Sequence, residues 1–129
     1  MLKVTINADC GNAPKALLLR DLNIAFARAD VEDILDKFTE DIRWQIVGVA
    51  DLRGKAAVRG ALEAMQNVLA SELLIHSIIT HGLEGAVNGV ITMEQGGSVA
   101  FCDVCQFASA AGKKIKTMTS YAVEIKTED

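Results

Sequence analysis

The sequence has little basic charge, few aromatic residues and almost no proline. Its 13 Lys and Arg residues are outnumbered by 17 Asp and Glu residues, which gives a formal net charge of −4, and they form no basic run. Because contacts to phosphate backbones need clustered Lys and Arg, we expect no nucleic-acid partner. With one proline and no Ser- or Gly-rich tract, the 129 residues contain no linker and fit a single domain.

Cysteine and long hydrophobic runs are also scarce. Three cysteines, an odd number, do not describe the disulfide framework of a secreted protein, so we expect a reduced, cytoplasmic environment. No apolar stretch approaches the ~20 residues that span a bilayer, and the first residues lack the apolar block of a signal peptide. We therefore expect no membrane partner. Half of the residues are hydrophobic, which is enough for one core.

Motifs for cofactors are missing as well. There is no glycine-rich phosphate loop, so no cofactor is expected. The segment Cys102-Asp103-Val104-Cys105 matches C-x-x-C, but a spacing of three in a strand puts the two sulfurs on opposite faces. With no second cysteine pair to complete a tetrahedral site, we expect no metal.

The hydrophobic pattern divides the chain into a helical first half and a strand-rich second half, which favours an α+β fold. Asn12 is a plausible N-cap for a first helix with Pro14 in its first turn, and Asp30 for a second. Gly54 opens a third helix, and Gln95-Gly96-Gly97 predicts a tight hairpin. The predicted strands are 2–6, 42–46, 73–81, 86–94, 99–108 and 115–125, and consecutive hairpins imply an antiparallel sheet.

Three segments resemble one superfamily in residues as well as in element order: 27–41 (ARADVEDILDKFTED), 53–59 (RGKAAVR) and 99–107 (VAFCDVCQF). They are similar to the nuclear-transport-factor-2-like superfamily, which includes the SnoaL-like proteins and ketosteroid isomerase. The resemblance implies a cystatin-like α+β roll, in which a cone-shaped, curved antiparallel sheet wraps around a long N-terminal helix. It implies one SnoaL-like domain over 1–129, with a core of 12–125 and an extension or short strand at 1–11. It also implies a small-molecule pocket in the cone and a second subunit on the outer sheet face.

Asp103 is the strongest candidate for chemistry. It lies among apolar neighbours in a predicted strand, where an ionised carboxylate is costly unless its pKa rises or it finds a hydrogen-bond donor. By resemblance it takes the place of the aspartic acid in ketosteroid isomerase that stays protonated and donates a hydrogen bond to an oxyanion. The alternative is a strand-end or interface aspartate paired with Lys or Arg.

The rest of the isomerase constellation is absent. In register with the family, its helical tyrosine falls on Leu22, and its general base falls on Ile46 or, with a gap, on Gln45. Leu and Ile cannot move a proton, so the steroid reaction by its usual mechanism is not expected.

Other groups are candidates to assist Asp103. By resemblance, Tyr121 faces into the cone with Thr117 and Thr119, although a packing role is equally open. His76 lies among apolar neighbours and is the better internal candidate of the two histidines, while His81 is expected at a solvated strand end.

The expected function is binding of a hydrophobic small molecule, with an isomerase or lyase reaction by acid–base proton transfer on a carbonyl compound. The rival is a non-catalytic dimeric module that binds a ligand or a protein. The mixed apolar and polar outer face, with Arg43, Gln45, Val104 and Gln106, predicts a homodimer surface. The catalytic candidates are Asp103, Tyr121 and His76, and the candidates that line the pocket are Leu22, Phe26, Trp44, Ile46, Phe101, Cys105, Phe107 and Thr119. Core packing is the alternative for the four aromatic residues of this set.

Overall fold

The fold is that of a computed structural model, which describes residues 2–126. Along the chain the elements are β1 (Lys3–Ile6), α1 (Pro14–Ala27), α2 (Val31–Asp36), β2 (Phe38–Ile46), β3 (Ala50–Arg53), α3 (Lys55–Ala64), β4 (Ala70–His81), β5 (Glu84–Met93), β6 (Ser98–Phe107) and β7 (Ile115–Ile125). None of the helices in this range is long and apolar enough to cross a membrane.

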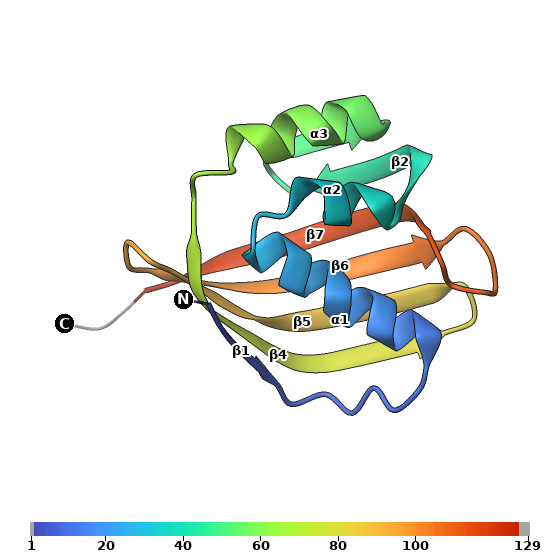
Figure 1. Cartoon of the computed structure of the whole chain (residues 1–129), viewed down its shortest axis with the longest axis horizontal. Helices are drawn as coiled ribbons and strands as arrows, with labels where there is room; N and C mark the ends of the chain where they lie inside the picture. Colours follow the sequence, from blue (N-terminus) through green and yellow to red (C-terminus); the bar gives the residue numbers. More distant parts are fainter. Residues whose placement is uncertain (1, 127–129) are drawn as a thin grey trace.

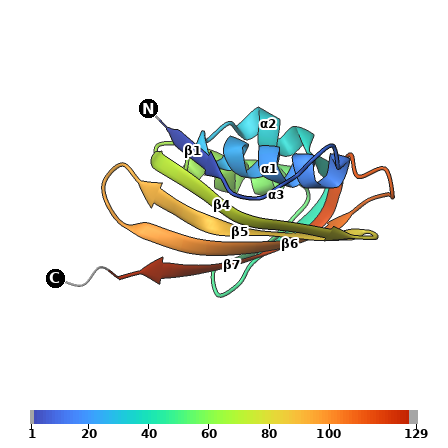
Figure 2. The same ribbon diagram turned by 90° about the horizontal axis from the view of Figure 1, so that it is seen from below.

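The strands described form one seven-stranded sheet in the order β1-β4-β5-β6-β7-β2-β3. The sheet curves, and α1, α2 and α3 all lie on its concave face, while the opposite face carries no helix within residues 2–126 (Figures 1 and 2). This arrangement confirms the predicted α+β roll around the N-terminal helix.

The antiparallel sheet predicted from the successive hairpins is confirmed for those hairpins, but the sheet also contains two parallel pairs. Strands β4 to β7 pair antiparallel, but β1 pairs parallel with β4 and β2 pairs parallel with β7. Parallel partners are joined by long connections rather than by hairpins, so the pattern of successive hairpins could not indicate them. The short strand β3 was also not predicted; it pairs with β2 around a tight turn.

Two glycines on the concave face of β5 let neighbouring elements approach it. A Cβ atom at Gly85 would lie 2.9 Å from Cδ1 of Leu19, so the missing side chain makes room for α1. At Gly89 a Cβ atom would lie 2.0 Å from the backbone oxygen of Leu74, which no rearrangement of a side chain can relieve. The sheet can therefore keep its close β4–β5 pairing only with glycine at position 89.

The helix caps agree with the predictions at one helix and differ at the other. The N-cap of α1 is Ala13, which makes no side-chain capping bond, so the prediction of Asn12 as the cap is wrong, although Pro14 does begin the helix. The predicted cap of α2 is confirmed, because Oδ1 of Asp30 accepts a hydrogen bond of 3.1 Å from the backbone N–H of Asp33. Between them Ala29 has a φ of 55°, which turns the chain from one helix to the other.

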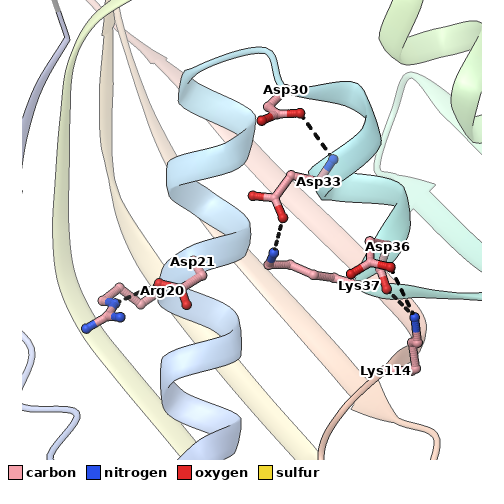
Figure 3. Close-up of polar contacts among 7 residues, drawn as sticks. All are labelled: Arg20, Asp21, Asp30, Asp33, Asp36, Lys37 and Lys114. Atoms are coloured by element: carbon pink, nitrogen blue, oxygen red, sulfur yellow. Dashed lines mark hydrogen bonds and ion pairs between the residues drawn. The ribbon is translucent and has the colours of Figure 1, made fainter.

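Polar contacts lie around α2 on its exposed side (Figure 3). Nζ of Lys37 lies 2.6 Å from the carboxylate of Asp33, four residues earlier. Lys114, in the loop before β7, reaches the carbonyl and the carboxylate of Asp36. Because α2 is only six residues long, its position depends mainly on its buried apolar residues Val31, Ile34 and Leu35, and these exposed polar contacts add little.

Substitution of two glycines tests this account of the sheet. We expect Gly89→Ala to lower the free energy of unfolding by about 2–3 kcal/mol, because the added methyl group meets backbone. Gly60→Ala is the matched control: it lies in α3 with nothing within 4 Å of its Cβ position and should raise stability by about 0.5–1 kcal/mol. Urea denaturation measures both, and equal effects would contradict the close approach at Gly89.

Candidate functional site

An apolar cavity of about 270 Å³ lies between the helices and the concave face of the sheet, where α1 ends. Helices α1 to α3 and strands β2, β4, β5 and β6 contribute to it. Its walls are Phe26, Ala27, Ala29, Val31, Ile34, Trp44, Leu62, Met65, Val68, Ala70, Ile91, Met93 and Val99. The indole of Trp44 carries the only N–H or O–H group among these side chains.

Two aromatic rings form one wall of the cavity. The rings of Phe26, in the last turn of α1, and Trp44, on β2, have centroids 5.3 Å apart with planes inclined at 53°, which is a favourable tilted arrangement for aromatic pairs. The Nε1–H group of Trp44 donates a hydrogen bond of 2.9 Å to Oγ of Ser120 on β7. The indole therefore presents carbon atoms to the cavity while its polar atom is satisfied by the sheet.

Asp103 lies on the concave face of β6, a central strand of the sheet. In the strand pairing it stands opposite Val87 of β5 on one side and Ser120 of β7 on the other. Its exposed fraction is 7%. Burial raises the pKa of the Asp103 carboxyl from 3.8 to about 6, and a hydrogen bond with the Ser120 side chain opposes that rise. Desolvation is therefore the cause of the predicted rise in the pKa of Asp103. The Ser120 hydroxyl is the hydrogen-bond donor that a buried carboxylate requires.

The alternative, an Asp103 paired with Lys or Arg, is not supported. Within residues 2–126, no ion pair involves it, and no Lys or Arg contributes to the shift of its pKa. Trp44, Ser120 and Asp103 form a hydrogen-bonded chain that runs from the cavity wall to a group able to hold or release a proton near neutral pH.

The structure places only two of the predicted lining residues at the cavity, Phe26 and Trp44. Leu22, Cys105 and Phe107 are buried in the core, and Ile46 and Phe101 are partly buried against it. Asp103 is also absent from the lining. For Phe107 the alternative of core packing is therefore the correct one, and the prediction that Leu22 and Cys105 line the pocket is wrong because both are packed in the core.

The predicted inward orientation of Tyr121 and Thr119 is wrong. Tyr121 pairs with Cys102, and Thr119 with Val104, so these residues share the outer face of the sheet, and Tyr121 is 50% exposed. Side chains alternate along a strand, so an error of one residue in the expected register reverses every orientation. The inward residues of β7 include Ile115, Met118 and Ser120 instead. Sequence reasoning missed Ser120 for this reason.

The predicted internal position of His76 is also wrong. The register between β4 and β5 shifts between Ile75 and Ser77, so that His76 is an extra residue in β4. Such a bulge resets the alternation: Ile75 and Ile78 face the core, while His76 and Ser77 are exposed. As a result His76 is exposed, as is His81, for which a solvated strand end was predicted.

The two cysteines of the C-x-x-C segment lie as predicted. Cys105 is buried on the concave face and Cys102 is partly exposed on the outer one, and both thiols are free. Burial, followed by the charge of Asp103, raises the pKa of both thiols, which disfavours the thiolate. The described residues contain no group of three His, Cys, Asp or Glu side chains placed to hold a metal ion.

The comparisons with known proteins agree with this architecture. A family model described as a SnoaL-like domain matches residues 19–118, and no curated protein matches the chain.

Among solved structures, similar chains include an NTF-2 like protein of unknown function from Burkholderia xenovorans LB400, with a TM-score of 0.74 and 14% identity, covering 94% of this chain and 91% of that one. A putative SnoaL-like polyketide cyclase from Shewanella denitrificans OS-217 has a TM-score of 0.73 and 10% identity over 87% and 92% of the two chains. An LEH-like epoxide hydrolase from M. tuberculosis has a TM-score of 0.71 and 18% identity over 85% and 83%. At these identities the likeness shows the fold.

The raised pKa of Asp103 predicts an unusual dependence of stability on pH. Because the folded-state pKa of about 6 lies above the ordinary 3.8, the folded protein binds the proton more tightly, and this stability is lost as the pH rises through 6. We expect the unfolding free energy to fall by about 2 kcal/mol more between pH 4 and pH 7 in the native protein than in Asp103→Asn. Urea denaturation at several pH values measures this difference.

The control is Asp41→Asn, which removes an exposed carboxyl from β2 and should keep the native profile. If Asp103→Asn and the native protein show parallel profiles, the protonation of Asp103 is not linked to folding.

Proposed function

Because this chain belongs to the SnoaL-like domain family, we propose that it binds a hydrophobic small molecule in the cavity at the end of α1. The observation that carries this proposal is the cavity itself: about 270 Å³ of space with walls of apolar side chains. Pockets for small molecules are typically concave and mostly apolar, with few polar groups. A ligand that fills this space gains the free energy of removing its own apolar surface and that of the walls from water.

The walls also limit the chemistry of the ligand. Their single N–H group, Nε1 of Trp44, is already bonded to Ser120, so a polar group placed deep in the cavity would lose its hydrogen bonds to water without replacement. Met65 and Val68, which line the cavity, are both more than half exposed and lie at its opening to solvent. The ligand we propose is therefore apolar at its buried end and carries any polar group near these two residues.

A second candidate function is acid–base catalysis on a hydrophobic carbonyl compound, of the isomerase or lyase type. It is favoured by one observation, the buried Asp103 whose pKa is raised to about 6, since a general acid works best with a pKa near the working pH. Asp103 does not line the cavity, however, so a substrate bound there touches it only if side chains of the cavity wall move. Binding without catalysis needs no such movement and is the function that the geometry supports better.

We further propose that the outer face of the sheet pairs two copies of this chain. Ile79, Val104, Tyr121 and Val123 form an apolar patch there, and each is at least 39% exposed. In the strand pairing Ile79 and Val104 are both opposite Ala86, which makes the patch continuous across β4, β5 and β6. A two-fold dimer would bring each patch against its own copy.

We also propose a cytoplasmic location, because reducing conditions keep the three free cysteines unpaired.

A charge at the centre of this patch tests the dimer. We expect the native protein to sediment as a dimer and Val104→Lys as a monomer, because two buried, unpaired ammonium groups would oppose association. Val49→Lys, which places the same charge on an exposed turn, should remain dimeric. A monomeric native protein would refute the dimer.

Blocking the cavity tests the binding function. N-phenyl-1-naphthylamine, an uncharged probe that fluoresces in apolar surroundings, should bind the native protein with one saturable site. Val99 points into the cavity from β6, and Val99→Phe should weaken binding at least tenfold because the phenyl ring occupies the space of the probe. Val49→Phe makes the same change on an exposed turn and should bind like the native protein. Equal binding by both variants would locate the probe elsewhere and contradict the proposal.

A further inference from the structure

Trp44 belongs both to the wall of the cavity and to the hydrogen-bonded chain that ends at Asp103. We propose that Trp44 and Ser120 are positioning residues that couple the protonation of Asp103 to the position of the indole ring in the cavity wall. The coupling itself does not depend on the binding function proposed above; only its consequence for a ligand does.

The direction of the hydrogen bonds supports this coupling. A serine hydroxyl has one proton to donate and can accept through two lone pairs. Its oxygen accepts the Nε1–H of Trp44 at 2.9 Å, and indole can only donate, so the Ser120 proton is left for the carboxylate of Asp103. The indole therefore fixes the hydroxyl in the orientation that stabilises the ionised form of Asp103.

Few other groups near Asp103 are able to do this. Its partners across the strands are Val87 and Ser120, of which only Ser120 is polar. The buried residues of α1, which packs over the sheet, are Ala16, Leu19, Leu22, Asn23, Ala25 and Ala27, and none of them titrates. On β6 the titratable neighbours are Cys102 and Cys105, whose thiols stay protonated because their pKa is raised. Ser120 is the side chain whose hydrogen bond lowers the pKa of Asp103.

The chain responds to protonation because hydrogen bonds in series strengthen one another. An ionised Asp103 polarises the Ser120 hydroxyl and makes its oxygen a better acceptor for the Trp44 N–H. When Asp103 takes up a proton, this polarisation is lost and the hold on the indole weakens. The same linkage holds in reverse: a displaced indole releases the hydroxyl, and Asp103 then binds its proton more tightly.

For a ligand the consequence is a defined pH dependence. A molecule that shifts the Trp44 ring breaks the chain and favours protonated Asp103. By linkage such a ligand binds more tightly as the pH falls through the pKa of Asp103.

Trp44 is the only tryptophan in the sequence, so its fluorescence reports on the chain without any label or ligand. We expect the emission of the ligand-free protein to change in one step with a midpoint near pH 6, the pKa of Asp103. The step should disappear in Ser120→Ala and Asp103→Asn and should persist in Ser120→Thr, which keeps the hydroxyl.

Two controls make this result specific. Imidazoles ordinarily change charge in the same pH range, so the double variant His76→Gln, His81→Gln on the exposed side of β4 must keep the step. Carbon-13 NMR of the aspartate carboxyls, which does not rely on tryptophan, should show a higher pKa for Asp103 in Ser120→Ala and in Trp44→Phe than in the native protein. A residue that only fills space would not move this pKa.

Failure of the coupling and failure of the binding function are distinguishable. An emission that is flat with pH, or a step that survives in Asp103→Asn, overturns the coupling and leaves the binding of N-phenyl-1-naphthylamine unaffected. An absence of probe binding overturns the binding function while the emission step remains. If both the coupling and the binding function hold, the native protein should bind the probe more tightly at pH 5 than at pH 7.5. This difference in affinity should vanish in Ser120→Ala. A pH-independent affinity in the native protein would refute displacement of the indole by the probe.

Discussion

The cavity results from a difference in length between one helix and the strands beneath it. With 14 residues, α1 is ~21 Å long, whereas the ten residues of β5 extend for ~33 Å. Near its N-terminal half, α1 approaches the sheet closely because Gly85 leaves room for Leu19. Beyond Ala27 the strands continue without it, and the shorter helices α2 and α3 cover the remaining concave surface without filling it (Figure 1).

A buried acid at the centre of the same face is the less expected feature. The ionised form of Asp103 has no cation beside it within residues 2–126 and is stabilised by one hydroxyl, so it reduces stability at neutral pH. An asparagine or an apolar residue in its place would avoid this cost. Residues that work against stability are commonly found where function requires them, and this supports the role proposed for Asp103.

The sequence was informative wherever a side chain and its near neighbours decide the structure. Apolar spacing located α1 and α3, the Asp30 side chain located the start of α2, and the alternation of Ile42, Trp44 and Ile46 gave the correct inward face of β2. Orientation failed where it depended on pairing between distant strands. The bulge at His76 and the register of β7 at Tyr121 follow from strand contacts that no local pattern encodes, and Ser120 was missed with them.

The same limit applies to the cavity. Phe26 and Leu22 belong to one apolar stripe of α1, yet the first lines a space and the second is packed in the core; their residue types do not distinguish the two situations. The difference between the two residues is their distance from the end of α1 at Ala27. Phe26 lies next to that end, whereas Leu22 lies five residues before it. A single fold can serve many functions because such ends and loops vary while the core is kept. In this chain the end of α1 leaves the Trp44 ring in the wall of an apolar cavity, with its N–H bonded to Ser120 opposite Asp103, and the proposed function of the site rests on this position.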